Sequence, residues 1–125
     1  MTESNRIRIV LTTVAIEADA ASLADALVGE RLAACVSVSA PMRSVYRWQG
    51  AVETATEWQL IAKTTSDALG ALVQRLEALH PYDTPEILVL AADGASHAYA
   101  AWVAAQTRAE AQAPAASQSA ASSAK

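Results

Sequence analysis

The 125-residue sequence has no phenylalanine, a single cysteine, and only four glycines and four prolines. The lone Cys35 excludes an internal disulfide framework and a metal site built from cysteines alone. Basic residues are few, because nine Lys and Arg stand against thirteen Asp and Glu, which gives a net charge of −4. This acidic balance argues against a general nucleic-acid-binding protein. No apolar run approaches the roughly 20 residues that a membrane span requires.

The residues that are present predict one globular domain followed by a tail. Hydrophobic residues make up 53% of the chain and charged residues 18%, and ~100–150 residues is the usual size of one domain. We expect residues 6–106 to fold and the Ala/Ser-rich residues 107–125 to form a disordered tail, because they offer no apolar stripe to bury. The polar residues 1–8 lack a signal-peptide pattern, so we expect a cytoplasmic protein that binds neither nucleic acid nor membranes.

Hydrophobic periodicity predicts alternating strands and helices along the domain. Two extended segments flank a turn at Gln49 and Gly50, and Ser66 is a plausible N-cap for the second helix. The full expected order is a strand at 7–12, a helix at 20–32, strands at 35–39, 44–48 and 52–64, a helix from Ser66 to His80, a strand at 86–92 and a short helix at 96–105. This order predicts an α+β fold of the ferredoxin-like type, a split β-α-β-β-α-β with a short C-terminal helix.

Two features of this pattern predict an oligomer. Residues 87–92 form an unbroken apolar run, which is typical of a strand buried on both faces. Residues 52–64 would span about 40 Å at ~3.3 Å per residue, well beyond a usual strand. We therefore expect other subunits to cover the open face of the sheet and to pair with the projecting hairpin.

Several sequence motifs resemble those of one known family, in the family's order and spacing. They are ERLAACV at residues 30–36, SVYRWQG at 44–50, IAKT at 61–64, HPYDTPEI at 80–87, and a Tyr-x-x-Trp pattern at Tyr99 and Trp102. Together they resemble the CutA (CutA1) divalent-cation tolerance proteins over about residues 9–103. The resemblance implies a ferredoxin-like fold, a homotrimer similar to the PII signalling proteins, and a role in tolerance to divalent metals, with copper bound by some members.

The resemblance also bears on a metal site. Members credited with copper binding have a Cys at the position of Thr12 and a second His at the position of Leu79, whereas His80 and Glu86 remain in this sequence. One imidazole and one carboxylate are a thin donor set for Cu(II), so we expect any binding of copper or another divalent metal to be weak. A structural alternative for His80 is that its protonated ring caps the helix C-terminus.

A second group of candidate residues would line a ligand cleft between subunits. This cleft group comprises Tyr46, Trp48, Glu57, Lys63 and Tyr82. The aromatic members have an alternative role in subunit packing, because aromatic residues are enriched in interface cores. The charged members equally suit a solvated stripe, and Tyr82 suits a simple turn. Cys35 is expected to be a small buried hydrophobe.

The sequence gives little support for catalysis. It contains no glycine-rich phosphate loop, no Gly-x-Ser-x-Gly elbow and no HExxH pair. We expect a non-enzymatic trimer that binds a divalent metal or a small ligand in clefts between subunits. The alternatives are a PII-like signalling module that senses a metabolite, and a purely structural trimer that supports a partner complex.

Overall fold

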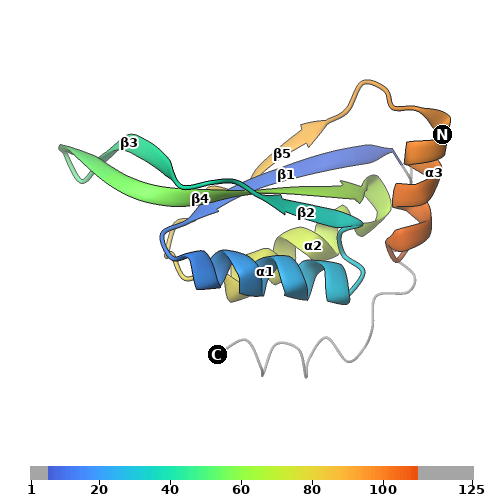
Figure 1. Cartoon of the computed structure of the whole chain (residues 1–125), viewed down its shortest axis with the longest axis horizontal. Helices are drawn as coiled ribbons and strands as arrows, with labels where there is room; N and C mark the ends of the chain where they lie inside the picture. Colours follow the sequence, from blue (N-terminus) through green and yellow to red (C-terminus); the bar gives the residue numbers. More distant parts are fainter. Residues whose placement is uncertain (1–5, 110–125) are drawn as a thin grey trace.

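The computed structural model describes residues 6–109 and has a mixed α+β fold, as the sequence predicts. Three strands lie between the first two helices, as the expected segments at 35–39, 44–48 and 52–64 predict, one more than the β-α-β-β-α-β plan contains (Figure 1). The elements in chain order are β1 (Ile7–Val14), α1 (Glu17–Gly29), β2 (Cys35–Val38), β3 (Met42–Trp48), β4 (Ala51–Thr65), α2 (Ser66–Leu79), β5 (Leu88–Ala91) and α3 (His97–Gln106).

The strands form one antiparallel sheet in the order β2-β4-β1-β5, and β3 pairs with β4 off this path. β4 has 15 residues, which makes it about 50 Å long at ~3.3 Å per residue. Its second half pairs with β1, whereas its first half pairs with β3 as a hairpin that projects from the body (Figure 1). The predicted turn is confirmed, because Gln49 and Gly50 have φ values of 51° and 84°, as two-residue hairpin turns require.

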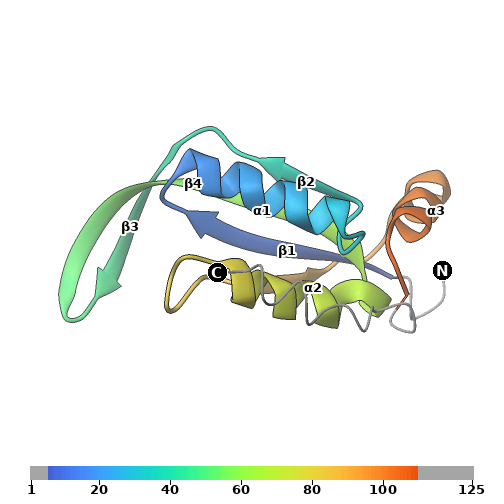
Figure 2. The same ribbon diagram turned by 90° about the horizontal axis from the view of Figure 1, so that it is seen from below.

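Helices α1 and α2 cover one face of the sheet, which we call the covered face (Figure 2). Alternate strand residues point to this face. The core that results joins β1 and β4 to both helices, and its fully buried members include Val10, Val14, Leu27, Leu60, Leu72 and Leu76.

The helix ends differ from the predicted ones in two places. Thr65, rather than Ser66, caps α2, because its hydroxyl accepts a hydrogen bond from the Ala68 N–H at 3.2 Å. The Ser66 hydroxyl instead accepts a hydrogen bond from Arg8 Nε at 2.9 Å. α1 spans Glu17–Gly29 rather than 20–32, and it ends before Arg31, which adopts a left-handed φ of 61°.

Within residues 6–109, no helix lies over most of the opposite face, which we call the open face. It is formed by Ile9 and Leu11 of β1, Ile61 of β4, and Leu88 and Leu90 of β5, as the alternation and the strand register require. α3 packs at one end of the sheet, where Ala100 and Val103 enclose Ile7 (Figure 1). The apolar run at 87–92 therefore lies on an edge strand that is exposed in the single chain.

The folded part continues slightly beyond residue 106, where the tail was predicted to begin. Thr107 is buried and its hydroxyl donates to the Val103 carbonyl, while the Arg108 N–H donates to the Arg31 carbonyl at 2.9 Å. The rest of the predicted tail, residues 110–125, lies outside the described residues. Over residues 6–109, the helices are too short or too polar to cross a membrane.

Candidate functional site

A groove of about 820 Å³ lies between the β3–β4 hairpin and the segment that follows α2. It opens at the hairpin end of the open face, since Thr13 and Gln59 form its floor. The groove brings together four of the five predicted cleft residues together with the predicted metal ligand Glu86. Its lining is Thr13, Met42, Ser44, Val45, Tyr46, Trp48, Glu57, Gln59, Tyr82, Asp83, Thr84, Pro85 and Glu86.

The hairpin presents its aromatic side chains through simple strand alternation. Tyr46 and Trp48 are two residues apart on β3, so both side chains point to the same face. The register places Glu57 opposite Met42 and Glu53 opposite Tyr46, on that same face. One wall of the groove is therefore aromatic with carboxylates beside it.

The second wall is fixed to the hairpin by a hydrogen bond. The Tyr82 hydroxyl donates to Glu57 Oε2 at 2.7 Å, and only 9% of Glu57 is exposed. Burial first, and then the hydrogen bond to Glu57, raise the pKa of the Tyr82 phenol well above its ordinary value. The phenol consequently stays protonated and serves as a hydrogen-bond donor to the Glu57 carboxyl group.

His80 lies directly behind Tyr82, and both of its ring nitrogens are occupied. Nε2 lies 3.0 Å from the Thr13 carbonyl oxygen, and the Tyr82 N–H donates to Nδ1 at 3.1 Å. A carbonyl partner requires a proton on Nε2, and an N–H partner requires a lone pair on Nδ1, so the ring is neutral. Burial, the largest cause, lowers the pKa of His80 and favours the same neutral form.

This arrangement corrects the expected capping role of His80. Its backbone N–H, rather than a protonated ring, reaches the last turn of α2 by donating to the Leu76 carbonyl at 2.9 Å. The ring instead joins the end of β1 to the segment after α2. Its centroid lies 4.9 Å from that of Tyr82, so it also supports the groove wall from behind.

Lys63 is the predicted cleft residue that the structure places elsewhere. Its ammonium lies 3.7 Å from Cys35 Sγ and 3.5 Å from Ser37 Oγ on the neighbouring strand β2. Lys63 and Glu57 share one face of β4, as predicted, but six residues separate them by about 20 Å at ~3.3 Å each. Cys35 is only half-buried and has polar neighbours, Lys63 and the Tyr99 hydroxyl at 3.9 Å, so it is not a buried hydrophobe.

Comparison with known proteins identifies the family. A family profile described as "CutA1 divalent ion tolerance protein" matches residues 8–106. The chain belongs to the CutA1 family. The divalent-cation tolerance protein CutA of Thermus thermophilus is 45% identical over 95 residues, which cover 76% of this chain and 92% of that protein.

Solved CutA structures have the same fold as this CutA1 chain. The T. thermophilus Cut A1 structure has a TM-score of 0.79 at 43% identity and covers 82% of this chain and 99% of its own. CutA from Synechococcus elongatus gives 0.79 at 46% identity, covering 86% of this chain and 95% of its own. The same S. elongatus protein has been solved complexed with a Bis-Tris molecule, with a TM-score of 0.76, 45% identity, and coverage of 84% and 97%.

The donor set of this CutA1 chain does not fit a tight copper site. Thr12 is buried in the core and Leu79 supplies no donor, while the two nitrogens of His80 are already hydrogen-bonded. Glu86 is exposed at the groove. Over residues 6–109, no group of three or more His, Cys, Asp or Glu side chains is arranged to hold a metal ion. The expected weak binding at His80 and Glu86 stays a prediction.

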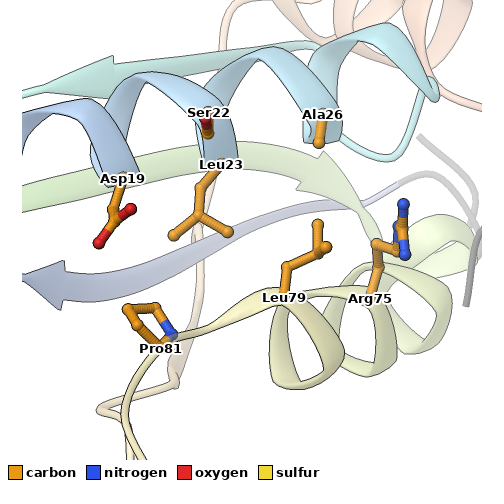
Figure 3. Close-up of a pocket in the computed structure, with 7 residues that line it drawn as sticks. All are labelled: Asp19, Ser22, Leu23, Ala26, Arg75, Leu79 and Pro81. Atoms are coloured by element: carbon orange, nitrogen blue, oxygen red, sulfur yellow. The ribbon is translucent and has the colours of Figure 1, made fainter. Parts of the chain in front are cut away.

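A smaller cavity of about 160 Å³ lies between α1 and α2 (Figure 3). Leu23 and Leu79 form its apolar wall, and Arg75 stands at its end (Figure 3). The Arg75 guanidinium makes a two-pronged ion pair with Glu30 at 3.0 Å, which ties the two helices together. This cavity is therefore a packing gap beside a structural ion pair.

Sequence reasoning missed part of the groove. Met42 lies on the same face of β3 as Tyr46 and Trp48, but it was missed because β3 begins two residues before the predicted strand at 44–48. Asp83 and Thr84 had a weaker signal, because two flanking prolines marked their segment only as a turn.

Proposed function

We propose that this CutA1 protein is a non-enzymatic, cytoplasmic homotrimer of ferredoxin-like plan that binds a small ligand in the groove, where subunits meet. The observation that carries the proposal is the groove itself. It combines a buried carboxylate, a phenol hydrogen-bonded to it and two half-exposed aromatic side chains on one projecting hairpin. Small-molecule sites have this composition of aromatic walls with few fixed polar groups.

The exposed apolar surface supports the trimeric part of the proposal. Leu88 and Leu90 of the open face are 50% and 43% exposed in the single chain, and Val45 and Val52 of the hairpin are 60% and 63% exposed. Large apolar side chains left exposed in these numbers indicate an interaction site. A second copy of the chain that covered the open face would close the groove on its exposed side.

The Bis-Tris complex of the S. elongatus relative supports a small-molecule role, because it shows one family member with an organic molecule bound. Divalent-metal binding is the weaker candidate for this chain. Ligation by His80 would first break one of its two hydrogen bonds, to Thr13 or to Tyr82. A signalling role like that of the PII proteins would use the same groove as its sensor.

A thermal-shift screen with divalent metals and small metabolites tests the proposal. We expect a stabilising ligand whose effect Trp48→Ala abolishes, with Glu77→Gln, an exposed change on α2, as the matched control. A metal shift that His80→Ala removes and Trp48→Ala retains would place binding outside the groove. Absence of any shift in a stable trimer would favour a purely structural role.

A further inference from the structure

The groove carries charge of only one sign. Three of its thirteen lining residues are acidic, Glu57, Asp83 and Glu86, and none is Lys, Arg or His. The arginines on β3, Arg43 and Arg47, alternate onto the strand face opposite Tyr46 and Trp48. An anionic ligand would therefore meet carboxylates without a basic partner from these lining residues.

The Glu57 carboxylate is built into the groove and has an unused oxygen. Nine-tenths of the residue is buried, and Oε2 accepts the Tyr82 hydrogen bond. Among the hydrogen bonds of residues 6–109, none reaches Oε1. The buried side-chain atoms of residues 6–109 that lack a partner do not include Oε1, so this oxygen reaches the groove surface, where a cation or a donor can approach it.

The aromatic walls favour the same kind of partner. Tyr46 and Trp48 point from one face of β3 into the groove, and Tyr82 closes it from the other side. The faces of aromatic rings attract cations, and clusters of such rings recognise quaternary ammonium groups. The volume of about 820 Å³ lies within the range of small-molecule sites.

We propose that the groove binds an organic cation, an amine or quaternary ammonium compound with an apolar body, through Glu57 and the aromatic wall of Tyr46 and Trp48. This inference rests on the proposed small-ligand function and narrows it to one chemical class. It excludes nucleotides and other phosphate-bearing metabolites as preferred ligands of this groove, because their charge has the wrong sign.

A set of three probes of nearly equal shape tests the charge preference directly. They are choline, its neutral carbon analogue 3,3-dimethylbutan-1-ol, and the anion 3,3-dimethylbutanoate. Calorimetric titration into the full-length protein at low salt should give an affinity for choline roughly 100-fold above that for the neutral alcohol, since the cation–π contact and the Glu57 carboxylate each contribute about a factor of ten. The anion should bind more weakly than the alcohol.

Variants of the groove sharpen this test. Glu57→Gln keeps an acceptor for Tyr82 but removes the charge, so it should reduce choline affinity roughly tenfold and leave the alcohol unaffected. Glu86→Gln should also lower the affinity for choline, by less than Glu57→Gln does. Because Glu86 is exposed, this variant still tests the charge preference if the Glu57 variant fails to fold. Glu77→Gln on α2 should change nothing.

The outcomes separate this inference from the function on which it rests. Equal, Trp48-dependent binding of all three probes would overturn the cation preference and leave a ligand groove in place. Preferred binding of the anion would overturn the preference outright. Choline binding that survives both Glu57→Gln and Trp48→Ala would show that the cation binds elsewhere. Absence of choline binding overturns the inference, whereas the thermal-shift screen still decides the wider function.

Discussion

The two faces of the sheet are built from the same alternating strands, yet they have different uses. On the covered face, Val10 and Leu60 are each 1% exposed beneath α1 and α2. On the open face, Leu88 and Leu90 are 50% and 43% exposed. The single chain thus buries one face by itself and leaves the other exposed, with the groove at its end, where we propose that a partner subunit and a ligand bind.

The largest expected effect is on assembly through the open face. Leu90→Asp should dissociate the proposed trimer, because burying an unpaired charge costs about 3–5 kcal/mol. Light scattering coupled to gel filtration should show a mass near three times 13.0 kDa for the wild type and a smaller one for the variant. Gln74→Asp, exposed on α2, is the control and should keep the wild-type mass. A monomeric wild type would refute the assignment of the open face to assembly.

The next effect concerns the covered face. Leu72→Ala removes a side chain that is 0% exposed between α2 and the sheet. Such a change should lower the free energy of unfolding by about 2–5 kcal/mol, because the helix cannot fully collapse into the cavity. Urea titration would measure the loss. If the Leu72→Ala variant is still a trimer at low denaturant, the covered face contributes to folding and the open face to assembly independently. If the variant dissociates there, the two contributions are coupled.

Stability should also depend on pH through His80, which links β1 to the groove wall. Burial lowers the pKa of His80 from its ordinary 6.5, so the unfolded chain binds a proton at a pH where the folded chain does not. The contribution of the neutral His80 ring to the free energy of unfolding is fully present above pH ~6.5. It is lost as the pH falls below that value, by at most about 1.4 kcal/mol per pH unit.

Unfolding of the wild type and of His80→Gln between pH 7.5 and 5.5 would measure this dependence. The variant should lose less stability on acidification than the wild type does. His97→Gln, at an exposed position of α3, is the matched control and should keep the wild-type slope. Equal slopes for the wild type and His80→Gln would contradict the neutral, buried ring.

The smallest effect should be a gain. The Thr12 hydroxyl is buried on the covered face and has no hydrogen-bond partner within residues 6–109. Thr12→Val keeps the shape and removes an unsatisfied polar atom, so it should stabilise the chain by about 1 kcal/mol or less. Thermal melting would detect the rise, and a fall would mean that the hydroxyl has a hydrogen-bond partner in solution, such as a buried water.

Much of the fold could be predicted because its signals are local. Strand alternation indicated which side chains share a face, and the Gln49-Gly50 pair marked the hairpin turn that the backbone angles confirm. Alternation puts Tyr46 and Trp48 on one face of β3, whereas the strand register, which the structure supplies, puts Glu57 on that same face. Pro81 ended α2 at the expected place, because a residue before proline avoids the helical region.

What the sequence did not reveal depends on partners that are distant along the chain. Thr65 and Ser66 are equally good caps by composition, and Arg8, 58 residues away, binds the serine. The two hydrogen bonds of His80 decide its role, and one comes from Thr13, 67 residues away. Periodicity reports on which face a side chain lies but not on the partner that reaches it.

The length of β4 has a consequence for motion along a single strand. Residues 58–65 are bonded to β1, and residues 60–63 also to β2, whereas residues 51–57 have only β3 beside them. Amide hydrogens in the outer half should therefore exchange with solvent through small local openings, and those in the inner half only when the domain opens as a whole. One strand thus runs from the centre of the sheet to the groove, so a ligand held there should slow amide exchange in the outer half of β4, far from the core.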